Sequence, residues 1–253
     1  MTNKFVQSIL GFAFCILAAG CSTPPQITAW VKVDGAPKNL AVYKGVLYSM
    51  GTNNFREFIL NSGDTFKDKT VYDIGTGTGV YAVLAMQAGS KYVVATDIDP
   101  VAVLNAKFNA RHFGYADKID VRLVTQAAPG AYAVLKDNER FDLIISNPPW
   151  GTTHPIDLAS SLTDDSFMLI RSIMQDLNKH LNPHGSAYLP IGNIYAIKLI
   201  EHLAAEQHLT MEILDEKTRQ GLINAFSLPP EKRVDGFFLP AAIIKLTPRE
   251  PGV

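Results

Sequence analysis

A glycine-rich turn between a predicted strand and a predicted helix constrains the fold of this chain more than any other feature. Residues 70–74 form an apolar run typical of a buried strand, and Gly75, Gly77 and Gly79 follow it directly. Glycine is favoured in such a turn because it adopts backbone angles that other residues avoid and lets a ligand approach without a Cβ in the way. A helix is predicted over 79–88, so the segment has the strand–turn–helix order of a ligand-binding α/β unit.

The chain alternates between strand and helix patterns from residue 70 onward. Strands are expected at 70–74, 92–96, 120–124, 141–145, 186–191, 209–214 and 236–246, and helices at about 79–88, 100–112, 164–181 and 193–207. This alternation is typical of a mainly parallel sheet with helices on both faces. We therefore expect an α/β fold built on a doubly wound, mainly parallel seven-stranded sheet.

Asp97 ends the second predicted strand of this unit, where an acid accepts hydrogen bonds from both hydroxyls of a ribose. The dinucleotide pattern Gly-x-Gly-x-x-Gly would need a glycine at position 80, where the chain has Val80. It has Asp-x-Gly-x-Gly-x-Gly from Asp73 to Gly79 instead. This pattern resembles the first motif of class I S-adenosylmethionine-dependent methyltransferases, and the resemblance covers roughly residues 50–245. It implies a Rossmann-like fold, methyltransferase activity and S-adenosylmethionine as the cofactor.

The resemblance also implies a role for each residue of the cofactor site. Asp73 would approach the methionine amino group, directly or through water, and Asp97 would bind the ribose. Ile98 would pack on the adenine. Related enzymes usually carry a further acid after the third strand, which accepts from the adenine amine; this chain has none there, and Gln126 is the expected replacement. The remaining residues expected to line the cofactor are Gly75, Gly77 and Gly79.

The second chemical motif is Asn147-Pro148-Pro149-Trp150, directly after the predicted strand at 141–145. Two successive prolines hold the backbone extended and remove two donors, so carbonyl groups stay free to accept. The side-chain oxygen of Asn147 and the carbonyl of Pro148 are expected to accept both hydrogens of an NH2 group, while Trp150 offers a flat face for stacking. These four residues are predicted to bind the methyl acceptor, and Asn147, Pro148 and Trp150 to take part in catalysis.

This tetrapeptide resembles the Asn-Pro-Pro-Tyr motif of glutamine-amide methyltransferases, which include the release-factor enzymes, and of methyltransferases that act on the exocyclic amine of adenine. The resemblance implies transfer to a planar NH2 group, either a protein glutamine or another amide, or adenine in RNA or DNA. A net charge of −1 gives no sign of the excess positive charge with which proteins bind duplex nucleic acid, and this favours the amide as acceptor. A non-catalytic envelope lipoprotein that keeps the fold as a binding module is the alternative from another class.

The N-terminus has the features of a targeting segment. Lys4 precedes an apolar run over residues 9–20, which is the length of a signal h-region and shorter than the ~20 residues of a membrane-spanning helix. The run ends at Cys21, followed by Ser22, and resembles a bacterial lipoprotein lipobox with Cys21 as the lipidated residue. We therefore expect a membrane-anchored protein of the cell envelope, or a cytoplasmic one if the signal is not used. Export conflicts with cofactor supply, because S-adenosylmethionine is made in the cytoplasm.

These features predict three parts of the chain: a lipoprotein-type signal at 1–21, a linker and short extension at 22–65, and the methyltransferase domain at 66–250. Within the extension, short strands are expected at 30–33 and 40–43. A helix over residues 53–60 is expected to be a surface helix, with Asn53 or Asn54 as its cap.

The remaining candidates carry less. Thr52 or Arg56 would approach the cofactor carboxylate if the resemblance extends that far. His154 would either touch the substrate or be an exposed loop histidine. No metal site is expected: the two cysteines lie in the first 21 residues, and Pro183 breaks any helix that would align His180 with His184.

Overall fold

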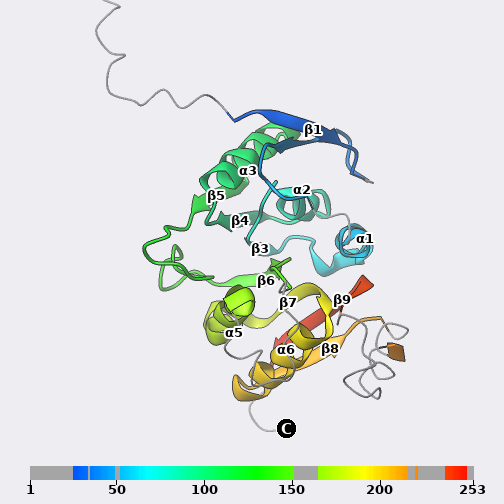
Figure 1. The fold of residues 1–253 in the computed structure, drawn as a ribbon, viewed down its shortest axis with the longest axis vertical. Helices are drawn as coiled ribbons and strands as arrows, with labels where there is room; N and C mark the ends of the chain where they lie inside the picture. The colour runs from blue at the N-terminus through cyan, green and yellow to red at the C-terminus, as the bar shows by residue number, and fades with distance from the viewer. Residues whose placement is uncertain are drawn as a thin grey trace, which may run out of the picture.

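A computed structural model describes residues 25–33, 35–48, 52–150, 165–215, 220–221 and 237–249 (Figure 1). The predicted signal segment with Cys21, and His154, lie outside the described residues. The elements in chain order are β1 (Ile27–Val31), β2 (Leu40–Tyr43), α1 (Asn53–Asn61), the 3-10 turn η1 (Gly63–Thr65), β3 (Thr70–Ile74), α2 (Val80–Gln87), β4 (Tyr92–Asp97), α3 (Pro100–Phe113), β5 (Ile119–Leu123), β6 (Phe141–Ser146), the 3-10 turn η2 (Asp165–Phe167), α5 (Met168–His180), β7 (Leu181–Asn193), α6 (Ile194–Glu206), β8 (Leu209–Ile213) and β9 (Phe237–Pro248).

Seven of these strands form one sheet in the order β5-β4-β3-β6-β7-β9-β8. The five strands from β5 to β7 are parallel, and β9 pairs antiparallel with both β7 and β8. This confirms the predicted mainly parallel seven-stranded sheet. The chain winds outward from β3 in both directions, through β4 to β5 and through β6 to β7. Ligands of such sheets bind outside the carboxyl ends of the strands, at the point where the order reverses.

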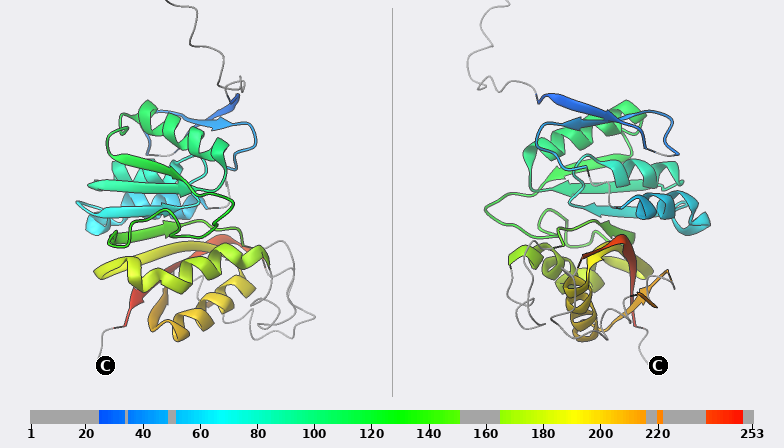
Figure 2. Two further views of the ribbon diagram at one scale, coloured as in Figure 1. Left: turned by 90° about the vertical axis from the view of Figure 1, so that its left-hand side faces the viewer. Right: turned by 45° about the vertical axis from the view of Figure 1, so that its right-hand side comes forward.

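Helices cover both faces of the sheet. Residues of α1, α2 and α3 share one apolar core with the sheet, and residues of α5 and α6 share the other. Figure 2 shows α5 and α6 side by side, consistent with their direct packing contacts. Helix α2 is buried from Val80 to Met86, so it is apolar all round, as expected of a helix enclosed by neighbouring elements.

The antiparallel hairpin of β1 and β2 lies on α3 (Figure 1), where two buried asparagines hold it. The Asn105 amide accepts from Tyr43 N at 2.9 Å and donates to Ala41 O at 2.9 Å. Asn109 accepts from Ala41 N at 3.0 Å, and donates to Ala41 O and to Thr78 O, each at 2.8 Å. Because Thr78 belongs to the glycine-rich turn, Asn109 ties the hairpin to the candidate cofactor loop.

Helix α1 differs from the expected capped surface helix. Thr52 precedes it, and no side chain caps its first turn. The Asn54 amide donates to Ala241 O of β9 at 2.7 Å instead. One face of the helix is buried because α1 packs against α2 and β9; its buried residues are Phe55, Arg56 and Ile59.

Strand β7 begins earlier than the predicted strand at 186–191. His184 adopts a φ of +63°, and the chain leaves α5 directly into extended backbone at Leu181. A Cβ on Gly185 would lie 3.0 Å from Asp142 O, so glycine is required where β7 passes this close to β6. The register between the two strands shifts between Phe141 and Leu143. Pro183 and Gly185, which favour the end of a helix, therefore lie within an irregular first part of strand β7.

Candidate functional site

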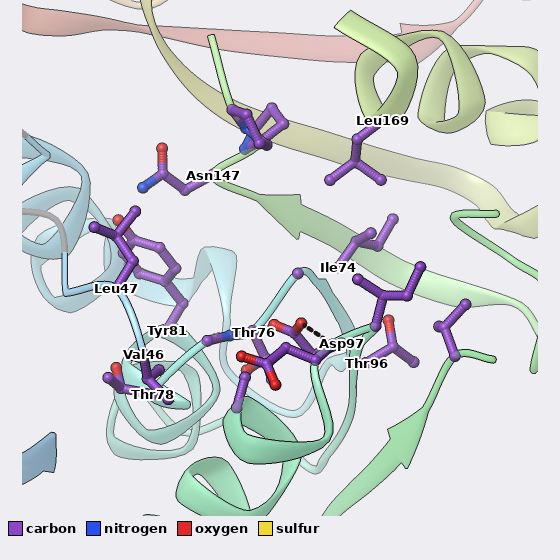
Figure 3. Close-up of a pocket in the computed structure, with 18 of the residues that line it drawn as sticks. Val46, Leu47, Ile74, Thr76, Thr78, Tyr81, Thr96, Asp97, Asn147 and Leu169 are labelled. Atoms are coloured by element: carbon purple, nitrogen blue, oxygen red, sulfur yellow. Dashed lines mark hydrogen bonds between the residues drawn. The ribbon is translucent and has the colours of Figure 1, made fainter. Parts of the chain in front are cut away.

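A pocket of about 680 Å³ opens at the carboxyl edge of the parallel strands (Figure 3). That volume is within the range of about 300–1,000 Å³ typical of ligand sites. Both sequence motifs contribute to its wall. The lining consists of residues 45–48, 56, 74–78, 80–81, 96–99, 102, 124, 129–131, 147–150, 168–169 and 172.

The turn after β3 has the backbone that its glycines predict. Gly75, Gly77 and Gly79 have φ values of +70°, +55° and +81°, in the region that favours glycine. Gly75 and Gly77 line the pocket, whereas Gly79 does not. A Cβ on Gly79 would lie 3.0 Å from the Cα of Ala106, so this glycine serves the close approach of α2 to α3. The role of Gly79 toward the cofactor stays a prediction, whereas Gly75 and Gly77 lie in the pocket wall.

Asp73 lies beneath the turn rather than in the pocket wall. Its side chain is fully buried, and one carboxylate oxygen accepts from the Thr76 hydroxyl at 2.6 Å. The other oxygen, Oδ1, has no hydrogen-bonding partner among the described residues. Burial raises the pKa of Asp73 to about 7, against the lowering effect of the Thr76 hydrogen bond. Asp73 therefore holds the loop through Thr76, and a direct approach to a ligand in the pocket does not fit this geometry.

Asp97 is placed as the sequence predicts, at the end of β4 and in the pocket wall. One carboxylate oxygen accepts from Gly77 N at 2.8 Å and the other from Asp99 N at 2.9 Å. Each oxygen keeps a lone pair, because a carboxylate oxygen accepts two hydrogen bonds. Burial raises the pKa of Asp97, although these backbone donors oppose the shift. The carboxylate is thus oriented by the backbone and still able to accept from hydroxyl groups.

One end of the pocket lies beyond Asp97, toward β5. Ile98 and Val124 line this end of the pocket. The packing of Ile98 on the adenine ring stays a prediction. Gln126 is exposed and does not line the pocket. The structure does not bring Gln126 to the pocket wall, so its role in place of the usual acid stays a prediction. The chain turns outward after Val124, whose backbone N–H donates to Asp97 O at 2.8 Å.

The four residues of the second motif all line the pocket directly after β6. Pro148 is buried, Pro149 is exposed, and Asn147 is half-buried. Asn147 lies across the pocket from Thr76 and Asp97 (Figure 3). No hydrogen bond joins the Asn147 amide to any described residue, so its oxygen is available to accept.

The Trp150 ring is fixed in the wall of the pocket. Its indole N–H donates to Pro190 O of β7 at 2.9 Å, and the ring packs against the core beside α5 and α6. The indole N–H therefore orients the ring relative to β7.

Sequence reasoning missed Tyr81 and left Arg56 as a minor candidate. The Tyr81 hydroxyl lies 2.6 Å from Thr52 Oγ1, and both Tyr81 and Arg56 line the pocket. Burial raises the pKa of Tyr81 to about 12. The Arg56 guanidinium lies 5.1 Å from the centre of the Tyr48 ring and is largely buried. Among the described residues that line the pocket, Arg56 is the one lysine, arginine or histidine.

The strand order, the glycine turn after β3 and the acid after β4 define a class I methyltransferase fold, and solved structures of such enzymes share it. A ribosomal protein L11 methylase from Lactobacillus delbrueckii subsp. bulgaricus matches 81% of this chain and 82% of its own, with a TM-score of 0.54 and 20% identity. The T. thermophilus 16S rRNA N2 G1207 methyltransferase, solved with AdoMet and guanosine, matches 87% of this chain and 50% of its own, with a TM-score of 0.57 and 15% identity.

Sequence similarity to known proteins is concentrated in the part of the chain that contains the glycine turn and Asp97. The model of the ribosomal protein L11 methyltransferase (PrmA) family matches residues 58–148. The ribosomal protein L11 methyltransferase of Vibrio vulnificus (strain YJ016) is 32% identical over 116 residues, 45% of this chain and 37% of that protein. A release factor glutamine methyltransferase from Cereibacter sphaeroides is 34% identical over 136 residues, 49% of this chain and 46% of that protein. The matches thus span about a third to a half of the length of these relatives.

The fold is thus that of class I methyltransferases, and the sequence similarity to such enzymes lies in the part of the chain that includes the glycine turn and Asp97. Within the part of the chain that the structure describes, no group of three or more histidine, cysteine, aspartate or glutamate side chains is placed to hold a metal ion. No helix among the described residues has the length and apolar character needed to cross a membrane.

Proposed function

We propose that this protein transfers a methyl group from S-adenosylmethionine to a planar NH2 group, and that the acceptor is a protein glutamine or another amide. The observation that carries the proposal is the unbonded Asn147 amide, which faces the same pocket as Asp97 and the glycine turn. Asn147 and Asp97 follow β6 and β4, which lie on either side of β3, so one extended ligand at this edge of the sheet spans both.

The residues of the pocket fit the cofactor. The carboxylate of Asp97 has lone pairs left for two ribose hydroxyls. Gly75 and Gly77, whose positive φ favours glycine, add no Cβ to the part of the loop that lines the pocket. Arg56 supplies a buried positive charge on the wall, which suits the methionine carboxylate. When bound, S-adenosylmethionine supplies an activated methyl group on a sulfonium, so the protein's task is to position the acceptor.

The acceptor motif provides that positioning. An amide nitrogen is a weak nucleophile because its lone pair is delocalised. The Asn147 oxygen and the Pro148 carbonyl would accept hydrogen bonds from its two N–H groups. These bonds would orient the nitrogen and stabilise the positive charge that develops on it. Trp150, held by Pro190 O, would stack on the planar group.

The charges around the pocket favour an amide over a base in a nucleic acid. Its described lining includes two acids, Asp97 and Asp99, and one cation, Arg56, which is buried. A nucleic-acid substrate requires exposed cations near its phosphates. The names of the relatives, which include a ribosomal protein methyltransferase and a glutamine methyltransferase, agree with a protein acceptor.

The test is transfer of tritiated methyl from S-adenosylmethionine to fractionated cell extract, followed by identification of the labelled atom. We expect label in protein, on an amide nitrogen. Asn147→Ala should reduce transfer by ~100-fold or more and leave S-adenosylhomocysteine affinity nearly unchanged, because its contact forms with the acceptor.

Asn138→Ala is the matched control, since Asn138 is exposed and lies outside the pocket lining. Label on a carboxylate, thiol or carbon would contradict the NH2 assignment while leaving the methyltransferase intact. Label on adenine in RNA would keep the clamp but overturn the amide. Full activity of the Asn147→Ala variant would remove the clamp itself.

A further inference from the structure

The adenine end of the pocket follows from the strand order, and this step rests on the proposed function. Four neighbouring strands, β6, β3, β4 and β5, end at this edge of the sheet. The residues at their carboxyl ends are Asn147 after β6, Gly75 after β3, Asp97 as the last residue of β4, and Val124 after β5. With the methyl group near Asn147 and the ribose at Asp97, the adenine must lie farther along the same edge. That places it beside Ile98, Val124 and the segment 129–131.

The described side chains that line this end include no acid that follows β5. Two hydroxyl groups are present, those of Thr96 and Ser172. Thr96 is buried, and its Oγ1 lies 3.1 Å from the Tyr72 hydroxyl. Tyr72 in turn donates to Ala131 O. The Thr96 hydroxyl is thus part of an internal network.

Ser172, on the first turns of α5, is placed differently. Its Oγ accepts from Ala131 N at 2.8 Å and lies 3.8 Å from the position of a Cβ built on Gly130. The hydroxyl therefore stands against the segment 129–131, in the wall of the pocket. Its own hydrogen has no acceptor among the described residues. A hydroxyl that accepts one hydrogen bond from the backbone can still donate one to a ligand.

We propose that Ser172 is the residue that recognises the purine of the cofactor, by donating its hydroxyl hydrogen to a ring nitrogen. The chain then replaces an acid, which accepts from the exocyclic amine, with a donor. The two kinds of contact have different selectivity. An acid requires an amine at position 6, whereas a hydroxyl that contacts a ring nitrogen does not. It donates to an unprotonated ring nitrogen, or accepts from the N1–H of a 6-oxo purine with its remaining lone pair.

The experiment is titration calorimetry of the full chain. The ligands are S-adenosylhomocysteine, its 1-deaza, 3-deaza and 7-deaza analogues, and the 6-oxo ligand S-inosylhomocysteine. We expect the dissociation constant of the 6-oxo ligand to be within about tenfold of that of S-adenosylhomocysteine, since the Ser172 hydroxyl can donate to one purine and accept from the other. We also expect one deaza analogue to bind about tenfold more weakly than the parent ligand, because it lacks the ring nitrogen that Ser172 contacts.

Ser172→Ala separates recognition from loop support. It should weaken S-adenosylhomocysteine about tenfold, yet leave the affinity of that one deaza analogue unchanged, because the contact is already missing there. Gln126→Ala is the control and should change none of the affinities. The deaza series on the wild-type protein keeps the test valid if Ser172→Ala fails to fold.

Four outcomes would overturn the proposal. Equal weakening of every ligand by Ser172→Ala would show that Ser172 only supports Ala131. Equal binding of all three deaza analogues to the wild type would exclude a ring-nitrogen contact. Loss of affinity in Gln126→Ala would return recognition to that residue. If the wild-type protein binds none of the ligands, the proposed function fails as well; in the other three cases it stands.

Discussion

The carboxyl of Asp73 shows how one residue couples the cofactor loop to pH. Its pKa is about 7 in the folded protein because the side chain is fully buried, whereas an aspartate in the unfolded chain has a pKa of about 3.9. The unfolded state therefore releases its proton between pH 4 and 7, where the folded state retains it. The stability of the folded state should fall across this window, by about 1.4 kcal/mol per pH unit at most, and level off above pH 7.

Asp73→Asn should remove this component. Asparagine cannot ionise, and its side-chain oxygen can still accept from the Thr76 hydroxyl. The free energy of unfolding of the variant, relative to the wild type, should rise by about 2 kcal/mol between pH 5 and pH 7 and then stay level. Urea titrations at pH 5, 6, 7 and 8 measure the difference. Parallel pH profiles for the two proteins would mean that Asp73 is already ionised at pH 5.

Residues of the site were predictable where they belong to local motifs. Asp97 and Asn147 are placed as expected, because each directly follows a strand that the sequence predicts correctly. Tyr81 and Arg56 belong to no motif, and only the packing of α1 on α2 brings them to one pocket. Gln126 does not line the pocket, and no local pattern shows that the chain turns away from the pocket after Val124.

At the scale of elements, the contact between α2 and α3 depends on a glycine that lies outside the pocket lining. Gly79 has a φ of +81°, and an added Cβ would lie 3.0 Å from Ala106 Cα and 3.1 Å from its Cβ. Gly79→Ala combines backbone strain with a clash against a helix backbone, and should lower the free energy of unfolding by about 2–4 kcal/mol.

Gly114→Ala is the matched control. Gly114 has a similar φ of +85° at the end of α3, but nothing lies within 4 Å of its added Cβ. Only strain remains, of about 1 kcal/mol. Chemical denaturation of both variants separates the two effects. Equal losses of stability would show that the helix contact adapts to the extra methyl group.

The order and type of the elements were predictable because periodicity is a local signal. Their ends and contacts were less so. Strand β7 begins at Leu181, before the residues expected to end the helix, because pairing with β6 outweighs the local turn signal of Pro183 and Gly185. The exposed helix expected near residue 53 became α1, buried on one face, because β9, distant in the sequence, packs beside it.

At the scale of the whole molecule, the structure extends the catalytic fold toward the N-terminus. The β1–β2 hairpin packs on α3 through Asn105 and Asn109, and Asn109 also donates to Thr78 O of the cofactor loop. Periodicity does not predict this link, because the two asparagines lie on a helix whose other buried residues are mainly small and apolar. The hairpin therefore supports the site, although the sequence predicts only two short strands within an extension.

Lipidation of Cys21 stays a prediction, and the hairpin gives it a geometric consequence. Five residues separate Cys21 from Ile27, the first residue of β1. At about 3.5 Å per residue even when fully extended, a lipid on Cys21 would hold Ile27, where the hairpin begins, within about 20 Å of a membrane. Cys21→Ser should leave an unprocessed precursor, with residues 1–20 still attached, that takes up no labelled palmitate.

The wild-type protein should carry the label and fractionate with membranes. Its recovery as a soluble protein, with residues 1–20 intact, would refute lipidation and would also remove the conflict with the cytoplasmic supply of S-adenosylmethionine. If the lipid is confirmed, the methyl-transfer assay on extract should be divided between cytoplasmic and envelope fractions. Acceptors found in the envelope alone would then mean that an exported enzyme needs a supply of S-adenosylmethionine there, since transfer at Asp97 and Asn147 requires the cofactor.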